Sequence, residues 1–301
     1  MHPIKLAKIC ILQATITVVL ASFHQSAPHQ HLELHSVRHK SSLEKNRILI
    51  CPGFGYAAAD YIGHDNLVLS LVQQGWDRAQ IQVLNVNKRD WLNVFLRGVT
   101  DIKFWKGSAS PIRPAFRWYL DLISLEMRTF SAEVEDVKVI LIGHSAGGWL
   151  ARAAIGFLSG EVEGIQKMID LKNVAGIVTL GSPHLAPPSG IFDITRGALR
   201  ITNDYFPGAY FAPAIKYLTV MGCSIKGRGL AYDSYLRVCG VGDEHGDGFV
   251  PCCAGHLDGA SHFNLEGVGH DKYGFPDFIQ QWHDTMMEQM VYSNKEGILE
   301  K

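Results

Sequence analysis

The clearest chemical candidate in the sequence is a serine between glycines. Residues 143–147 read Gly-His-Ser-Ala-Gly, a G-x-S-x-G pattern that follows an apolar run and precedes an expected helix. Such a turn strains the backbone of Ser145 so that its hydroxyl is exposed, and Gly143 and Gly147 avoid steric clashes. The N–H of Ala146 would point at a developing oxyanion. The pattern predicts a nucleophile elbow, with a plain turn of small residues as the alternative.

A serine hydroxyl is a weak nucleophile, so it needs a base that an acid holds in place. Asp247 is the predicted acid, because Gly246 and Gly248 on either side suit a sharp loop at the end of a strand. Asp243 and Glu244 are alternative acids. An aspartate whose only role is to form the turn is the non-catalytic interpretation.

The predicted base is His270, which follows Gly269 and comes 23 residues after Asp247. That separation leaves enough chain for the loop to return to the serine, whereas other histidines lie closer to the acid. A surface or structural histidine is the non-catalytic interpretation. The alternative bases are His245, His256 and His262.

A second oxyanion donor is expected after the first core strand. Residues 52–55 read Pro-Gly-Phe-Gly there, and Gly53 allows close backbone approach. The N–H of Phe54 is the predicted donor, with Gly55 as the alternative. Residues 53–58 also fit G-x-G-x-x-A, a weak match to a dinucleotide-binding turn with Asp77 as its acid.

The elements that must position these residues alternate between strands and helices from residue 47 onward. This order is typical of a mostly parallel sheet with helices on both faces, so we expect a single α/β domain over residues 46–292 and a tail at 293–301. Segments 88–113 and 184–214 are expected to form loops or a small cap. Strands are predicted at 47–51, 80–86, 137–142, 174–180, 216–221 and, less regularly, 235–241; helices at 60–75, 114–130, 149–158 and 276–290.

Composition excludes several classes of protein. The 301 residues are 47% hydrophobic and 19% charged, which is not the composition of a disordered or fibrous chain. A formal net charge of −1 gives no reason to expect nucleic-acid binding. There is no H-E-x-x-H, CxxC pair or P-loop, so no metal or cofactor is expected. The six cysteines lack framework spacing, and we expect no obligatory disulfides.

The N-terminal residues differ in composition from the rest. Residues 1–45 contain six of the 14 histidines and only two of the 29 acidic residues. Lys5 and Lys8 precede an apolar run that ends in small residues, which predicts a signal peptide over residues 1–22; a signal anchor or a buried strand are alternatives. Residues 23–45 are basic and acid-poor, like a transit peptide or a linker. Entry into the secretory pathway and a secondary algal plastid are equally expected destinations.

With these motifs in order, the chain resembles the α/β-hydrolase lipases, and more narrowly the plant and algal group related to GPI inositol-deacylases. The resemblance covers about residues 46–285. It implies an α/β-hydrolase fold, a Ser145–Asp247–His270 triad without a cofactor, and hydrolysis of lipid or acyl esters. A lipid or small-molecule ester as partner, and association with a membrane surface, are further expectations. It does not extend to inositol deacylation. The stretches that carry it besides the triad motifs are 90–91, 104–107, 118–120, 148–152, 181–184 and 273–276.

Two other functions are kept open by the sequence. A non-catalytic binding protein on the same fold is the first, and a dinucleotide-binding oxidoreductase is the second. Several apolar residues of segment 184–214 would line an acyl pocket or, as the sequence favours, belong to the core. These are Leu185, Phe192, Tyr205, Phe206 and Tyr210.

Overall fold

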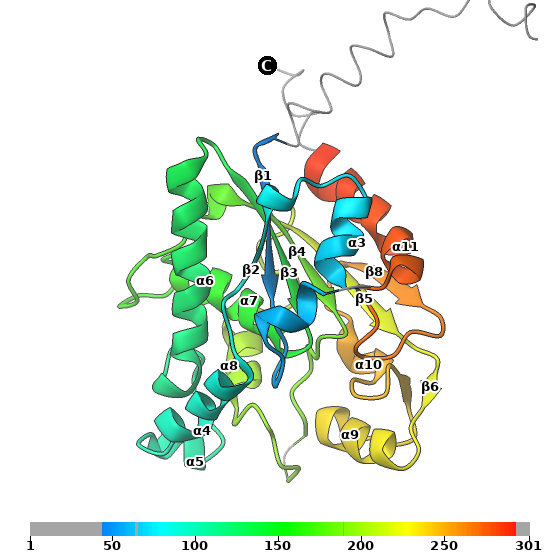
Figure 1. The fold of residues 1–301 in the computed structure, drawn as a ribbon. Helices are drawn as coiled ribbons and strands as arrows, with labels where there is room; N and C mark the ends of the chain where they lie inside the picture. Colours follow the sequence, from blue (N-terminus) through cyan, green and yellow to red (C-terminus); the bar gives the residue numbers. More distant parts are fainter. Residues whose placement is uncertain (1–43, 64–65, 189, 293–301) are drawn as a thin grey trace, which may run out of the picture. The chain divides into compact units, whose positions relative to one another are not determined.

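The central feature of the computed structural model is a sheet of six parallel strands, in the order β2-β1-β3-β4-β5-β8 (Figure 1). The structure describes residues 44–63, 66–188 and 190–292, which all belong to one compact unit, residues 42–301. The strands are β1 (Asn46–Cys51), β2 (Ile81–Val83), β3 (Lys138–His144), β4 (Val174–Leu180), β5 (Lys216–Gly222) and β8 (Ser261–Leu265). A two-stranded antiparallel ribbon pairs β6 (Ile225–Lys226) with β7 (His245–Gly246).

Helices connect the strands and cover the sheet. The α-helices are α3 (Leu67–Gln73), α4 (Leu92–Gly98), α5 (Ile102–Trp105), α6 (Pro114–Glu133), α7 (Ala146–Leu158), α8 (Ala198–Tyr205), α9 (Leu230–Cys239), α10 (Cys252–Gly255) and α11 (Pro276–Met286). Short 3-10 turns lie at Ala58–Tyr61, Arg78–Gln80, Lys88–Trp91 and Leu171–Asn173, and a π-helical segment, Met287–Tyr292, follows α11.

The core has two layers because side chains alternate across each strand. Leu49 and Leu141 face the layer that contains α6 and α7. Ile50 and Ile142, one position further along the same strands, face the layer of α3 and α11. Figure 1 shows α6 and α7 on one side of the sheet and α3 and α11 on the other. Both faces of β1 and β3 are therefore buried, which explains their continuous apolar sequences.

The predicted α/β class and mostly parallel sheet are confirmed. Strands β1, β3, β4 and β5 and helix α6 lie where the apolar runs and the helical spacing placed them. Helix α7 begins at Ala146, directly after the serine and three residues earlier than expected. Strand β2 is shorter than predicted, and the expected helix at 60–75 is a 3-10 turn followed by α3.

Two assignments from the sequence are wrong. The strand-like run 235–241 is not a strand, because residues 235–239 belong to helix α9, which begins after Gly229 and is capped by Gly240 with φ 86°. Tyr235 is fully buried in this helix. The helix starts before the run, so the run alone does not show the helical spacing of its apolar residues. Strand β8 was not expected. It pairs on one side only, and three of its five residues are polar, so its sequence lacks a strand signal.

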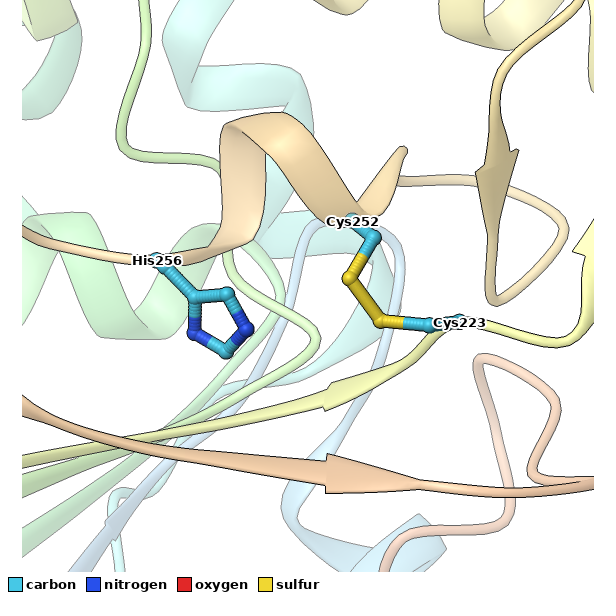
Figure 2. Close-up of side chains that lie close together, drawn as sticks. All are labelled: Cys223, Cys252 and His256. Atoms are coloured by element: carbon cyan, nitrogen blue, oxygen red, sulfur yellow. A yellow bond between two sulfur atoms is a disulfide. The ribbon is translucent and has the colours of Figure 1, made fainter.

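The structure contains one disulfide that the sequence did not suggest: Cys223 and Cys252 are bonded, with their Cα atoms 5.3 Å apart (Figure 2). The two cysteines are 29 residues apart, a spacing that matches no recognised disulfide pattern. The fold itself brings the end of β5 to the start of α10, and sequence spacing does not reveal that approach. Cys51 is buried, as expected.

The weaker segments contain more regular structure than expected. Segment 88–113 forms α4 and α5, and segment 184–214 contains α8. The predicted signal peptide (1–22), nearly all of segment 23–45 and the tail (293–301) lie outside the described residues. In the part of the chain that is described, no helix has both the length and the apolar character needed to span a bilayer.

Candidate active site

Ser145 occupies a strained turn between β3 and α7. Its φ of 51° and ψ of −125° are outside the regions that side-chain-bearing residues normally adopt. The turn is tight because Gly147 packs against the backbone carbonyl of Cys51, where a Cβ would collide with the oxygen. Gly53 allows a second close approach, since a Cβ there would lie 2.8 Å from the Ser145 Cβ. The strand–turn–helix setting predicted for this serine is present.

Asp247 and His270 meet in a buried pair. His270 Nδ1 donates to Asp247 Oδ2 at 2.7 Å, and the side chains are 6% and 0% exposed. The N–H groups of Phe249 and Val250 donate to the other carboxylate oxygen at 2.9 and 2.8 Å. Burial alone would raise the pKa of Asp247, but the adjacent His270 and these two donors hold the pKa below its usual value. The acid is therefore ionised and fixed in orientation.

Tyr273 adds a donor that the sequence did not suggest. Its hydroxyl donates to Asp247 Oδ2 at 2.8 Å and accepts from the N–H of Gly222 at 2.9 Å. Burial, and then the charge of Asp247, raise the pKa of Tyr273 well above its usual value, so the hydroxyl keeps its proton. In the sequence, Tyr273 is only part of the stretch 273–276, and a tyrosine near a turn gives no indication of this contact.

His144, the neighbour of the serine, links the predicted oxyanion loop to the predicted base. The N–H of Gly53 donates to the Tyr61 hydroxyl at 3.1 Å, and this hydroxyl lies 2.7 Å from His144 Nδ1. His144 Nε2 lies 2.7 Å from the backbone carbonyl of His270. A carbonyl only accepts, so Nε2 carries the proton and Nδ1 accepts from Tyr61. Burial, followed by the proximity of His270, lowers the pKa of His144 to about 3, so the ring is neutral.

The predicted oxyanion donors lie beside the serine. Phe54 and Ala146 line one cavity together with Ser145 and His270. Within the described residues, no backbone carbonyl accepts from the N–H of Phe54 or of Ala146. Both donors are therefore free to bind a developing negative charge.

The cavity at the serine measures about 460 Å³, within the range of small-molecule sites. Ser145 and His270 lie on its wall, and most of the remaining lining is apolar or aromatic. Helix α9 contributes two polar residues to the lining, Ser234 and Arg237. The expectation that five apolar residues of segment 184–214 belong to the core holds for Phe206 alone. The other four are exposed, and of these Phe192 lines the cavity while Leu185, Tyr205 and Tyr210 do not. The apolar lining includes Trp91, Val94, Phe116, Trp149, Leu150 and Ile194.

The alternative bases point elsewhere. His262 Nε2 lies 2.9 Å from the carbonyl of Leu257, and His256 bonds Thr219 and Asn264. His245 is exposed in β7. The alternative acids, Asp243 and Glu244, precede the loop that contains Asp247. Among these candidates, the structure pairs Asp247 with His270.

The turn after β1 does not have the form of a dinucleotide-binding site. Such a turn opens the long helix of a βαβ unit, whereas residues 53–57 lead into the four-residue 3-10 turn at Ala58–Tyr61. The N–H of Gly53 is directed at Tyr61. This segment packs beside the serine, and its residues Phe54, Gly55 and Tyr56 line the same cavity as Ser145.

Comparison with known proteins bears on the fold. Residues 117–205, which run from α6 through the elbow to α8, match the family model of the PGAP1-like alpha/beta domain. The Bacillus licheniformis lipase BlEst2 superimposes with a TM-score of 0.51 at 15% identity, over 82% of this chain and 92% of the lipase. The fold is that of the α/β-hydrolases.

Two further solved structures resemble this chain less closely. A Listeria innocua protein gives a TM-score of 0.46 at 13% identity, over 81% of this chain and 93% of its own. A metagenomic carboxyl esterase gives 0.47 at 10% identity, over 81% and 76%. No curated protein matches the sequence significantly. At these identities the likeness is one of fold.

Proposed function

We propose that this α/β-hydrolase is a serine esterase that cleaves carboxylic esters through an acyl-enzyme. The observation that carries the proposal is the shared cavity of Ser145 and His270, with the serine in a strained elbow and the histidine bonded to buried Asp247. A nucleophile, a base and an orienting acid are the groups that acyl transfer needs.

The mechanism follows from the position of each group. His270 Nε2 removes the Ser145 proton as the oxygen attacks the ester carbonyl, and Asp247 holds Nδ1 protonated so that Nε2 is the basic nitrogen. The N–H groups of Phe54 and Ala146 bind the oxyanion. The protonated histidine then gives its proton to the leaving alcohol. Water, activated by the same histidine, releases the acid from the serine.

The lining of the cavity favours an ester with an apolar acyl chain. Its aromatic and aliphatic walls would desolvate such a chain, while they give a sugar or a charged acyl group few polar partners. We therefore infer a lipid-like ester as the substrate class. The exposed side chains of Phe192, Ile194 and Phe249 lie at the same cavity and would contact a lipid surface.

Two measurements test the proposal. A fluorophosphonate probe should label the folded protein at Ser145, and Ser145→Ala should abolish both labelling and hydrolysis of p-nitrophenyl esters. A panel of acyl lengths, run beside galactolipids, phospholipids and acylglycerols, defines the substrate. If the folded protein is neither labelled nor active on any of these esters, the function is that of a non-catalytic binding protein.

A further inference from the structure

A cluster of potential metal ligands lies outside the proposed active site. Cys223, Cys252 and His256 each offer a ligand atom, and these atoms lie within 4.8 Å of one another. Figure 2 shows His256, at the end of α10, beside the disulfide that joins the start of α10 to the segment after β5. All three residues are partly exposed, so solutes reach the cluster.

Asn264 of β8 supplies a fourth polar atom at the cluster. Its Oδ1 lies 3.3 Å from Cys223 Sγ, 3.7 Å from Cys252 Sγ and 2.7 Å from His256 Nε2. In a tetrahedral zinc site, metal–sulfur bonds of about 2.3 Å and metal–oxygen bonds of about 2.1 Å place sulfur and oxygen about 3.6 Å apart. Both sulfur–oxygen separations are close to that value while the sulfurs are bonded to each other. After reduction the two sulfurs must move apart to about 3.8 Å to bind one zinc ion. The imidazole must move away from the amide by about 0.7 Å to reach the corresponding separation, roughly 3.4 Å.

The imidazole of His256 is already supported on its other side. Its Nδ1 lies 2.8 Å from the Thr219 hydroxyl, which lies 3.4 Å from the carbonyl of Ser261. When Nε2 binds a metal, Nδ1 carries the proton and donates to Thr219, which in turn donates to Ser261. Metal-binding histidines usually have such a partner on the second nitrogen.

We propose that the reduced form of Cys223 and Cys252, together with His256, is a zinc-binding site with Asn264 at the fourth position. A dithiol reductant breaks the sulfur–sulfur bond, forms its own disulfide and leaves two thiols on the protein. Zn²⁺ then displaces the two thiol protons and binds both sulfurs and neutral His256. The disulfide and the zinc site are alternative states, because the same sulfur atoms form both. This site departs from the sequence expectation of no metal, since its ligands do not form a recognised motif.

Either state would join the two segments that hold the predicted acid. Cys223 follows Gly222, whose N–H bonds Tyr273, and Cys252 follows Pro251, which pairs with Gly246 beside Asp247. Zinc would therefore restore the cross-link that reduction removes. This consequence for activity rests on the proposed function, whereas the binding of zinc does not.

The test is metal titration of the whole protein, reduced with a phosphine under anaerobic conditions. Reduced protein should bind one Zn²⁺ per chain and give thiolate–Co²⁺ absorption with Co²⁺, and oxidised protein should do neither. His256→Gln and Cys223→Ser/Cys252→Ser should weaken binding more than about 100-fold, and Thr219→Val about 10- to 100-fold. The matched control, Cys239→Ser/Cys253→Ser, should bind as the wild type does.

Several results would overturn the proposal. Reduced wild type that binds no more metal than the oxidised form, or a control variant that loses the metal, would do so. If the double variant at Cys223 and Cys252 does not fold, His256→Gln decides, because it keeps the disulfide and its folding can be checked in the oxidised state. Unchanged affinity in that variant excludes the site. These readouts are independent of esterase activity, so an inactive protein that binds zinc refutes the proposed function alone.

Discussion

His144 Nε2 donates a 2.7 Å hydrogen bond to the backbone carbonyl of His270. This contact joins the residue before the nucleophile to the residue proposed as its base, and the two rings lie 5.0 Å apart between centroids. The position of the base loop therefore depends on a side chain of the elbow itself. We infer that His144 acts through His270 as a positioning residue.

We expect His144→Phe to lower kcat about 5- to 30-fold, with little change in KM. Loss of the buried hydrogen bond costs about 1–2 kcal/mol and releases the loop that positions the base. His144→Gln, whose amide can donate to the same carbonyl, should recover part of kcat. Steady-state kinetics on a short p-nitrophenyl ester measure both. Full kcat in His144→Phe would show that the contact does not position the base.

The same histidine should make the protein sensitive to acid. The pKa of His144 is about 3 in the folded protein, against 6.5 without the fold. Between these values the unfolded chain binds a proton that the folded one does not, so stability falls as pH decreases from about 6.5 to 3. The loss is at most about 5 kcal/mol. Denaturant unfolding of His144→Gln should show a weaker pH dependence than wild type, while His245→Gln, at an exposed site, should match wild type.

Asp247→Asn should reduce kcat by about four orders of magnitude, because an amide no longer selects the protonated Nδ1 of His270. Asp243→Asn is the matched control and should retain activity within about twofold. Both variants change one carboxylate to an amide within the same short segment. The reverse pattern, with the larger loss in Asp243→Asn, would assign the acid to Asp243.

The sequence predicts those parts of the site that depend on local order along the chain. Strand β3 and the turn at Ser145 are visible because an apolar run, small residues and a helix follow one another within about twenty positions. Asp247 and His270 were predicted because the order of acid and base after the serine is regular in this fold.

The remaining parts of the site depend on contacts between distant segments. Tyr273 reaches Asp247 across 26 residues, and His144 reaches the His270 carbonyl across 126. The bonded partner of Cys223 is likewise set by the meeting of β5 and α10. Helix α9 differs from the sequence prediction for a related reason. Its buried face contains Tyr235, which packs against the loop of Asp247, and the Tyr235 hydroxyl accepts a hydrogen bond from the N–H of Gly248.

Tyr273→Phe should lower kcat about tenfold, because it removes a hydrogen bond that Asp247 Oδ2 accepts. Without that donor the carboxylate pKa should rise, and the acidic limb of the kcat/KM profile should move to higher pH. Tyr235→Phe provides a comparison, since its hydroxyl bonds the backbone near the acid without touching the carboxylate. An unchanged acidic limb in Tyr273→Phe would mean that His270 and the backbone donors alone fix the charge.

The apolar cavity predicts that acyl length can be changed from its rim. Ile194 lines the cavity and is 57% exposed, so a larger side chain fits there without disturbing the core. Ile194→Trp should lower kcat/KM for long-chain esters about tenfold while it leaves acetate esters nearly unchanged, since a blocked cavity excludes only the chain that would occupy it. Leu92→Trp, at a similarly exposed residue outside the cavity lining, is the control. Equal losses on short and long esters would show that Ile194 affects the catalytic groups, and no loss on either would place the acyl chain elsewhere.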